Sequence, residues 1–339
     1  MKPFVSVIIP NYNGKTFLQG CIESLEAQTY SNFEIIIIDN GSDDGSVDLI
    51  KTNFPRIKVI VNDKNLGFAK ANNQGYEIAT GSYIATLNND TKAEKNWLEN
   101  LILAAEANTK AGMCASKILS IKNPNQIDSV GVNICLDGMT RGRARLETDE
   151  GQYDMTDEIL LPSACAALYR RAMLDEIGFF DESFFAYCED TDLGLRGQLA
   201  GWSAILVPDA LVYHYYSETG GKYSSFKAYL VERNHLWVLI KNFPGELLFL
   251  SPFFTVYRFL LQGYAALTKK GATSEFLSAY SLLDILKLLA NAYLDTLKEL
   301  PELMQRRRAV NTGKKITRKE FYALLRKHKM TFSELVFKK

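Results

Sequence analysis

Cysteine is scarce in this sequence of 339 residues, and its spacing excludes two kinds of site. The five cysteines are dispersed without a CxxC pair, which argues against a zinc site and against a disulfide framework. We therefore expect reduced thiols, as in a cytosolic protein. The first residues, MKP, lead directly into an apolar run, so the sequence predicts no secretory signal peptide.

Glycine-rich phosphate-binding motifs are also missing. After the first apolar run the chain has neither GxGxxG, which binds dinucleotides, nor GxxxxGK[ST], which forms a P-loop. A dinucleotide-dependent enzyme and a P-loop enzyme are therefore not expected. The turn at 11–14, NYNG, is not a basic glycine-rich loop either, which speaks against a nucleotidyltransferase.

Net charge is zero, but the two signs are unevenly distributed. Residues 301–339 contain 12 Lys and Arg and 3 Asp and Glu, so the first 300 residues contain 27 and 36. A basic end on an acidic-leaning body suggests an anionic partner such as a membrane surface. Nucleic acid is not an expected partner, because neither a recognition motif nor interleaved aromatic residues accompany the basic residues.

Short β-branched runs alternate with helical patterns over the first hundred residues. This alternation predicts βαβ units and a mostly parallel sheet with helices on both faces, which is an α/β fold. A hydrophobic content of 47% supports a well-packed chain. The expected strands cover residues 4–10, 33–39, 57–61 and 83–87.

Polar residues follow these strands at the carboxyl ends, where α/β sheets bind their ligands. Asp39 ends the second run, and Asp90 closes the turn NND that follows the fourth. Asp39 is a candidate acceptor of hydrogen bonds from a base or ribose, or else a cap of the next helix. Asp90 is a candidate ligand of a divalent cation, because hard cations prefer oxygen ligands. The alternative for Asp90 is an ordinary polar turn.

Three carboxylates, Glu189, Asp190 and Asp192, open a helical stretch that follows a run of aromatic residues. One interpretation is favourable charge at a helix N-terminus. The other is a general base, because apolar neighbours raise the pKa of a carboxyl group and a positioned carboxylate can take a proton from a hydroxyl. Three acids exceed what a helix terminus needs, so we favour the general base.

His214 and Arg233 are further candidates. His214 ends an expected strand near the carboxylates, and a neutral imidazole is a suitable partner for a cation held by a carboxylate. The alternative is a packed or surface histidine. Arg233 lies on the next helix and is suited to phosphate charge, or to an ion pair with Glu232 or another nearby acid.

Residues 138–158 are polar and rich in Gly, Arg and Asp, without a hydrophobic period. We expect a long surface loop there. Loops of this length in a compact domain often form lids or binding loops.

The last hundred residues carry a different pattern. The apolar run 247–267 is interrupted by Pro252, Arg258 and Gln262. A central arginine costs about 2.5–3.5 kcal/mol on membrane insertion, which argues against simple spanning. The following helix is amphipathic. We expect these helices either to pack on protein, including a second copy of the chain, or to attach to an anionic leaflet. The expected apolar face of the amphipathic helix consists of Phe276, Tyr280, Leu283, Leu286, Ala290, Tyr293 and Leu297.

Several motifs taken together resemble the family-2 inverting glycosyltransferases of the GT-A fold. They are VIIPNYN (7–13), IDNGSDDGS (38–46), NLGFA (65–69), LNND (87–90), EDTDLGLR (189–196) with GW (201–202), His214, and RN (233–234). They cover residues 4 to about 240 in the order of the family. The likeness is greatest to the bacterial branch that includes rhamnosyltransferases of cell-surface polysaccharide assembly.

The resemblance implies a role for each matching residue. Asp190 would be the catalytic base, and Glu189, Asp192 and Trp202 would contact the acceptor. Asp90 and His214 would hold Mg²⁺ or Mn²⁺. The family's DXD element begins here with Asn88, which offers only a neutral oxygen. The residues implied in nucleotide binding are Pro10, Asn11, Tyr12, Asn13, Asp39, Asn40, Ser42, Asn65, Gly67, Asn88, Asn89 and Arg233.

The implied reaction is a single displacement with inversion at the anomeric carbon. The donor would be a UDP- or dTDP-sugar, with dTDP-rhamnose as one candidate, and the acceptor a hydroxyl of a glycan or lipid-linked saccharide. We expect the protein to lie in the cytoplasm, at the inner face of the cell membrane. It would contact the membrane peripherally, and a homodimer is a candidate oligomeric state. The alternative is a non-catalytic sugar-nucleotide-binding partner within a membrane glycan-assembly complex.

The resemblance also implies a domain division. Residues 1–240 would form the GT-A catalytic domain, with a nucleotide-sugar half at 1–110 and an acceptor half at 111–240. Residues 241–339 would form a helical region for membrane association or oligomerisation.

Overall fold

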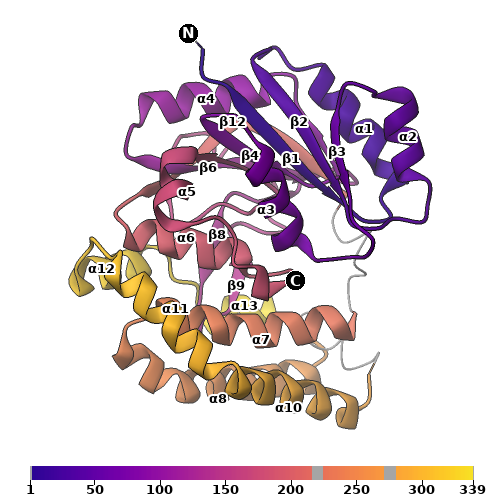
Figure 1. The fold of residues 1–339 in the computed structure, drawn as a ribbon. Coiled ribbons are helices and arrows are strands. Elements are labelled where there is room, and N and C mark those ends of the chain that lie inside the picture. Colours follow the sequence, from indigo (N-terminus) through magenta and orange to yellow (C-terminus); the bar gives the residue numbers. More distant parts are fainter. Residues whose placement is uncertain (1, 216–223, 271–279, 339) are drawn as a thin grey trace. The chain divides into compact units, whose positions relative to one another are not determined.

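A computed structural model describes residues 2–215, 224–270 and 280–338 (Figure 1). The chain divides into two compact units, of which the first contains residues 1–132 and 142–219 and the second contains 133–141 and 220–339. This division differs from the predicted boundary after residue 240. Helix α7 (Ser225–Asn242) belongs to the second unit, because its buried side chains pack against the helices that follow it.

The first unit is built on a mixed sheet with the strand order β10-β12-β6-β11-β4-β1-β2-β3. Four strands at one side are parallel to one another, which confirms the predicted parallel arrangement (Figure 1). All four contain β-branched residues, and all but the edge strand β3 are largely buried, as strands covered on both faces require. They are β1 (Val5–Asn11), β2 (Phe33–Asp39), β3 (Lys58–Val61) and β4 (Tyr83–Leu87).

The remaining strands extend this sheet beyond β4. β11 (Ala166–Arg170) runs antiparallel between β4 and β6 (Ala111–Ser120), and β12 (Ser203–His214) is parallel to β6. Three short strands pair at the margins: β5 (Thr91–Ala93) and β10 (Glu158–Ile159) with β12, and β7 (Ile127–Ser129) with β6.

Helices cover both faces of the sheet and form two apolar clusters. One face is covered by α1 and α4, whose Leu18, Ile22 and Trp97 are fully buried. The other is covered by α3, α5 and α6, which contribute Ala69, Met173 and Leu193. The helices of this unit are α1 (Lys15–Glu26), α2 (Ser46–Asn53), α3 (Phe68–Ile78), α4 (Trp97–Ala107), α5 (Arg171–Ile177), the 3-10 helix η1 (Glu182–Phe184) and α6 (Glu189–Leu199).

The second unit is helical. Both α10 and α11 pack on α7, and α13 packs on α8. The excursion at 133–141 contributes most of a small two-stranded sheet made of β8 (Val132–Ile134) and β9 (Thr140–Gly142). The other helices are α8 (Gly245–Leu267), α10 (Leu282–Lys298), α11 (Leu300–Thr312), α12 (Arg318–His328) and α13 (Phe332–Phe337).

Arg258, in the middle of α8, is fully buried inside this unit. Its guanidinium lies 2.7 Å from Asp137 Oδ2 and 2.8 Å from Glu232 Oε1. A buried arginine needs such partners, and they explain the charge within the apolar run. None of the helices in the described ranges combines the length and hydropathy that crossing a bilayer takes. The predicted helix after α8 is present as α10, and Phe276 of its expected apolar face lies outside the described residues.

Candidate active site

The polar residues predicted at the ends of β1, β2 and β4 form one hydrogen-bonded group. Asn11 and Asp39 are direct neighbours in the parallel β1–β2 pair. Asn11 Nδ2 donates to Asp39 Oδ1 at 2.7 Å, and Asn89 Nδ2 donates to Asn11 Oδ1 at 2.7 Å. The amide of Asn11 therefore links the end of β2 to the turn after β4.

Asp39 is fully buried and organises the turn that follows β2. Its Oδ2 accepts from the Ser42 amide at 2.9 Å, and its Oδ1 accepts from the Ser42 hydroxyl at 2.7 Å. The Ser42 hydroxyl in turn accepts from the Asn13 amide at 2.8 Å. The alternative that Asp39 caps the next helix is wrong, because α2 begins at Ser46 and its N-cap is Gly45.

The other residues predicted to bind the nucleotide lie around this group. Asn40 Nδ2 donates to the carbonyl of Gly67 at 3.2 Å, and the Asn65 side chain accepts from the Gly67 amide at 2.9 Å. Pro10 is half-buried, whereas the Tyr12 side chain is 45% exposed. An exposed ring beside buried polar groups is available to a ligand.

The turn after β4 places Asp90 beside His214. Asp90 Oδ1 lies 3.3 Å from His214 Nε2, and the backbone amide of Tyr215 donates to the Asp90 carbonyl at 3.0 Å. Pairing of β5 with β12 sets Thr91 opposite His214, which brings the two segments together. Asn88 Oδ1 is buried, and no hydrogen-bond partner for it is found in the part of the chain that the structure describes.

The second nitrogen of His214 also meets a carboxylate. His214 Nδ1 lies 2.7 Å from Asp128 Oδ2. Burial alone would lower the pKa of His214, but its contacts with Cys165, Asp128 and Asp90 together raise it well above the ordinary value. The ring therefore lies in a strongly negative environment, which also favours a bound cation.

The donor atoms at Asp90 and His214 fit a divalent cation that shares its ligands with a substrate. A carboxylate and an imidazole are suitable ligands for Mg²⁺ or Mn²⁺. Within the described ranges no three His, Cys, Asp or Glu side chains gather as a complete metal site. A cation here would take its remaining ligands from diphosphate oxygens and water, and the buried Asn88 Oδ1 is an additional neutral oxygen at this turn.

The predicted catalytic base stands at the start of α6. Asp190 is half-buried; its Oδ2 accepts from the Ala164 amide at 3.2 Å, and its Oδ1 accepts from the Thr191 amide at 2.7 Å. Burial raises the pKa of Asp190 against the opposing effect of these hydrogen bonds. A carboxylate with a raised pKa is a better proton acceptor.

Glu189 differs from its neighbour in its surroundings. It is buried, and no hydrogen-bond partner of its Oε2 is found among the described residues. Burial, reinforced by the negative charge of Asp190, raises the pKa of Glu189 well above the ordinary value. Of the two adjacent carboxyl groups, Glu189 is therefore the one whose neutral form the surroundings favour more strongly.

The backbone before α6 has an unusual conformation. Phe185, Tyr187 and Cys188 have φ angles of 65°, 69° and 66°, in the left-handed region that favours glycine. Such strained residues cluster at functional sites, where the surrounding structure holds them in place. The sequence gives no sign of this conformation, because none of the three residues is glycine.

Two further residues predicted to contact the acceptor are Asp192 and Trp202. Asp192 is fully buried and pairs with Arg196 of the same helix at 2.8 Å. Trp202 contacts Glu176 and lies beside Gly112. That is the Ala111 end of β6, whereas His214 lies at the Ser120 end. The structure therefore does not bring Trp202 to the site.

Arg233 belongs to α7 of the second unit. Its guanidinium lies over the Trp237 ring, 4.3 Å from the ring centroid, and its Nε donates to Asn234 Oδ1 at 2.9 Å. The alternative partner, Glu232, pairs with Arg258 instead. Its contact with a nucleotide stays a prediction.

Sequence reasoning missed two contributors to the site. One is Asp128, which stands in the three-residue strand β7 and belongs to no motif. The other is the backbone amide of Ala164, which no sequence pattern identifies as a donor to Asp190. Their roles follow from the strands that lie next to one another.

The chain matches two family models. The first, described as glycosyl transferase family 2, matches residues 6–178. The second, described as glycosyl transferase family group 2, matches residues 155–294. The first of these matches covers β1 to the end of α5 and so includes the whole polar group at the ends of β1, β2 and β4.

Curated proteins with similar sequences include several glycosyltransferases. Glycosyltransferase AglE of Haloferax volcanii is 36% identical over 102 residues, which are 29% of this chain and 34% of that protein. Glycosyltransferase GlyG of Streptococcus pneumoniae is 36% identical over 104 residues, 30% of this chain and 35% of that protein. The O-antigen biosynthesis protein RfbC of Myxococcus xanthus is 25% identical over 225 residues, 63% of this chain and 17% of that protein. The matches thus span about a third or less of each relative.

Two solved structures share the fold. Staphylococcus aureus TarS aligns with a TM-score of 0.56 and 18% identity, over 95% of this chain and 54% of that one. GalNAc-T7, solved with UDP, GalNAc and Mn²⁺, aligns with a TM-score of 0.58 and 19% identity, over 70% of this chain and 48% of that one.

Proposed function

Glycosyl transferase family 2 is the family to which this chain belongs, and on that premise we propose that it is an inverting, metal-assisted transferase. The donor is a UDP- or dTDP-sugar, with dTDP-rhamnose among the candidates. The acceptor is a hydroxyl of a glycan or of a lipid-linked saccharide. Membership of the family is the premise; the transferase activity, donor, acceptor, metal and stereochemistry are the proposal.

One arrangement carries the proposal. The loop before β11 accepts a hydrogen bond from Asn88 through the Cys165 carbonyl at 2.8 Å and donates one to Asp190 from the Ala164 amide at 3.2 Å. Consecutive residues of one loop therefore fix both the turn that carries Asp90 and the carboxylate of Asp190. A single displacement needs the base and the leaving-group site in a fixed relative position, and this loop provides it.

The chain's own residues perform distinct parts of this reaction. Asp190 accepts the proton of the acceptor hydroxyl as its oxygen bonds to the anomeric carbon from the face opposite the diphosphate. The bond from that carbon to the diphosphate oxygen breaks, and the nucleoside diphosphate leaves. Asp90 and His214 would hold a divalent cation, which when bound supplies Lewis-acid stabilisation of the leaving diphosphate. No covalent bond to the enzyme forms.

The nucleotide is held by the polar group at the ends of β1 and β2. Asp39 has its carboxylate fixed by Asn11 and Ser42, so it can accept from a base without reorganising. The exposed Tyr12 ring supplies a face for stacking. Neither contact distinguishes uracil from thymine.

We further place the enzyme at an anionic membrane surface, through α8. This helix exposes Phe253, Tyr257 and Leu260 at helical spacing, and no charged side chain is exposed between residues 249 and 267. A stripe of this length exceeds the scattered apolar residues of an ordinary surface. The stripe, here called the α8 apolar face, consists of Phe249, Leu250, Phe253, Val256, Tyr257, Leu260, Tyr264 and Leu267.

The neighbouring helix and the charge of the unit support the same placement. On α10, Leu283, Leu286 and Leu297 of the predicted apolar face are more than half exposed. The second unit holds 22 Lys and Arg against 10 Asp and Glu, a net charge of +12, and the first unit is correspondingly −12. Apolar contact and positive charge together favour an anionic leaflet. Pairing of this unit with the same unit of a second copy would bring together two surfaces of equal positive charge, which repel each other.

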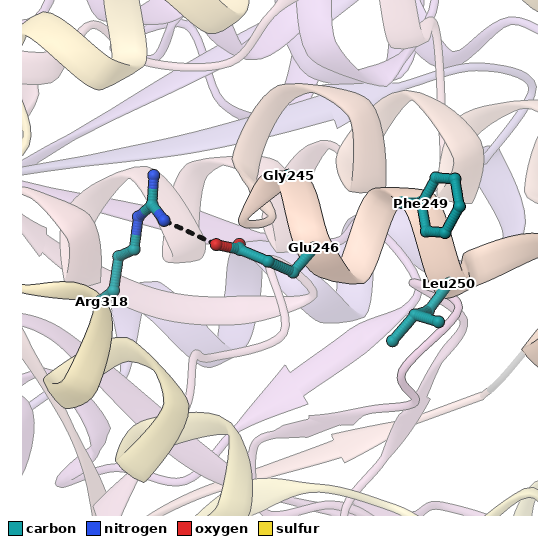
Figure 2. A pocket seen from close by; sticks show the side chains of 5 residues that line it. All are labelled: Gly245, Glu246, Phe249, Leu250 and Arg318. Carbon is teal, nitrogen blue, oxygen red and sulfur yellow. Dashed lines mark hydrogen bonds and ion pairs between the residues drawn. The ribbon is translucent and has the colours of Figure 1, made fainter.

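The start of α8 is polar. A shallow pocket there is lined by Gly245, Glu246, Phe249, Leu250 and Arg318, with Arg318 paired to Glu246 at 2.6 Å (Figure 2). The exposed ion pair lies at one side of this pocket, and Phe249 and Leu250 begin the α8 apolar face at the other. The charged end marks where the interfacial part of the helix would begin.

The test of the proposed reaction is a transfer assay on the purified chain with a panel of UDP- and dTDP-sugars and Mn²⁺. The anomeric configuration of the product is read by NMR. Retention of configuration would contradict the single displacement. Specific nucleotide binding without turnover by any acceptor, unchanged in Asp190→Asn, would favour the non-catalytic partner.

A further inference from the structure

We propose that Asp128 is a positioning residue of the metal site, and that Arg145 in turn fixes Asp128. Asp128 sets the orientation and the tautomer of His214. This inference rests on the proposed role of His214 as a metal ligand. It adds two residues from outside the motifs to the site.

The contacts of His214 carry the proposal. The ring has a carboxylate at each nitrogen: Asp128 Oδ2 lies 2.7 Å from Nδ1, and Asp90 Oδ1 lies 3.3 Å from Nε2. A histidine that ligates a metal commonly donates its other N–H to a carboxylate, which fixes the ring and its tautomer. With Nδ1–H donating to Asp128, Nε2 is the nitrogen that faces Asp90.

The sheet explains how residues so distant in sequence meet. At the end of β6, β12 pairs on one side, where His214 is opposite Ser120, and β7 pairs on the other, where Ser129 is opposite Ile118. Neighbouring strands lie about 4.8 Å apart, so β7 and β12 are separated by about 10 Å. The side chains of Asp128 and His214 bridge that distance across the end of β6.

Arg145 holds the opposite side of Asp128. Its guanidinium nitrogen lies 3.5 Å from Asp128 Oδ1, so the two carboxylate oxygens face different partners. The segment that carries Arg145 is attached to β7 itself: the Leu146 amide donates to the Ile127 carbonyl at 2.8 Å, and the Ile127 amide donates to the Glu147 carbonyl at 2.9 Å. The position of Arg145 is therefore tied to that of Asp128.

The backbone around Arg145 supports a specific placement. Ala144 and Leu146, on either side of it, have φ angles of 61° and 66°, which side chains rarely adopt. Lys117, nearly buried in β6, pairs with Asp149 and Asp154 and so fixes the following part of the same segment. The segment predicted as a long surface loop is thus held against the sheet at the point where it reaches the metal site.

The experiment measures Mn²⁺ binding directly, by the electron paramagnetic resonance signal of free Mn²⁺, with Mn²⁺ alone and with Mn²⁺ and UDP. The variants are His214→Ala, Asp128→Ala, Asp128→Asn and Arg145→Gln. Asp157→Asn is the matched control, because Asp157 pairs with Arg143 at 3.1 Å in the same segment and is not a partner of His214. Circular dichroism checks that each variant is folded.

We expect His214→Ala and Asp128→Ala both to weaken Mn²⁺ binding, the latter about 10- to 100-fold. Asp128→Asn keeps a hydrogen-bond acceptor, so we expect a smaller loss of Mn²⁺ affinity in this variant. The loss should be smaller still in Arg145→Gln, and Asp157→Asn should bind Mn²⁺ as the natural protein does. If His214→Ala weakens binding but Asp128→Ala does not, the inference is overturned and the metal site stands. If His214→Ala has no effect, the ligand role of His214 fails and the inference fails with it.

A second readout separates positioning from mere support of the fold. The chain has only three histidines, so the ¹⁵N imidazole resonances of His214 can be assigned by comparison with His214→Ala. Without metal, at a pH at which the ring is neutral, we expect Nδ1 to carry the proton in the natural protein and in Asp157→Asn. In folded Asp128→Ala the ring should show a mixture of tautomers. An unchanged tautomer there would contradict the proposal.

Discussion

The backbone amide of Ala164 lies 3.2 Å from the carboxylate Oδ2 of Asp190, and the carbonyl of the next residue, Cys165, accepts from Asn88. This loop therefore fixes the proposed base relative to the turn that carries Asp90. Because the donor to Asp190 is a backbone group, side-chain substitution in the loop leaves it in place. A loss of activity on changing the Asp190 side chain can thus be attributed to the loss of its function as a base.

Asp190→Asn should lower kcat about 10²- to 10⁴-fold, because a general base is lost, while the affinity for the nucleotide stays the same. Transfer is measured by release of nucleoside diphosphate. Glu189→Gln is the comparison, because it changes the adjacent carboxyl group without changing its size, and it should lose less activity than Asp190→Asn if Asp190 is the base. Equal losses in the two variants would mean that Asp190 is not the base.

The pH profile follows from the direction of the pKa shift. Burial raises the pKa of Asp190 above the ordinary 3.8, and the carboxylate must be unprotonated to act. The value of kcat should therefore be at its maximum at pH values above the raised pKa, and it should fall as the pH drops through that pKa. The acidic limb of kcat should lie above pH 3.8. A rate independent of pH down to that value would contradict the assignment.

Gly14 offers a test of the nucleotide pocket. A Cβ at this position would lie 2.0 Å from Asn89 Nδ2 and 2.5 Å from Asn11 Oδ1, so Gly14→Ala should displace the hydrogen bond between the two amides. Forced repacking costs about 1–3 kcal/mol, and we expect weaker nucleotide binding by about tenfold or more. The measurement is isothermal titration with UDP and dTDP.

Gly20→Ala is the matched control for this variant. A Cβ there meets only the end of the Lys92 side chain, at 3.0 Å, and alanine favours the helix by about 1 kcal/mol. Gly20→Ala should bind nucleotide normally. Equal binding by Gly14→Ala would show that the Asn11–Asn89 contact has no part in the pocket.

The identity of the base can be tested by thermal shift. The protein is melted with Mn²⁺ and, separately, UDP, dTDP, GDP and CDP. A ligand that binds only the folded state stabilises it by about 2.7 kcal/mol at a hundred times its dissociation constant. We expect the largest metal-dependent shift with UDP or dTDP. A larger shift with GDP or CDP would overturn the proposed donor class.

Membrane contact can be tested by sedimentation with vesicles. The natural protein should bind phosphatidylglycerol vesicles, bind phosphatidylcholine vesicles weakly, and lose binding as salt increases. Phe253→Ser with Leu260→Ser on the α8 apolar face should reduce binding about tenfold or more, since each buried side chain contributes about 1.5–3 kcal/mol.

The matched control is Met155→Ser, because Met155 is 81% exposed and lies in the first unit. It should bind vesicles as the natural protein does. If the α8 double variant binds normally but changes from dimer to monomer in light scattering, the face belongs to a second copy of the chain instead.

The sequence predicted the sheet and much of the site because both depend on local patterns. Buried β-branched runs followed by polar turns identified β1, β2 and β4, and the same turns carry Asn11, Asp39 and Asp90. Parallel strands bring their carboxyl ends to one edge of the sheet, so the sequence alone predicts that these residues lie close together. Asp190 followed from an unusual density of acids at a helix start.

Tertiary structure alone decided the rest. His214 and Asp128 are 86 residues apart, and they meet only because β12 and β7 flank the same end of β6. Whether Trp202 reaches the site, and whether α7 belongs to the first or the second unit, likewise depend on which elements lie side by side. Periodicity and turn residues act over a few neighbouring positions, whereas strand order is fixed by packing of the whole chain, and no local pattern records it.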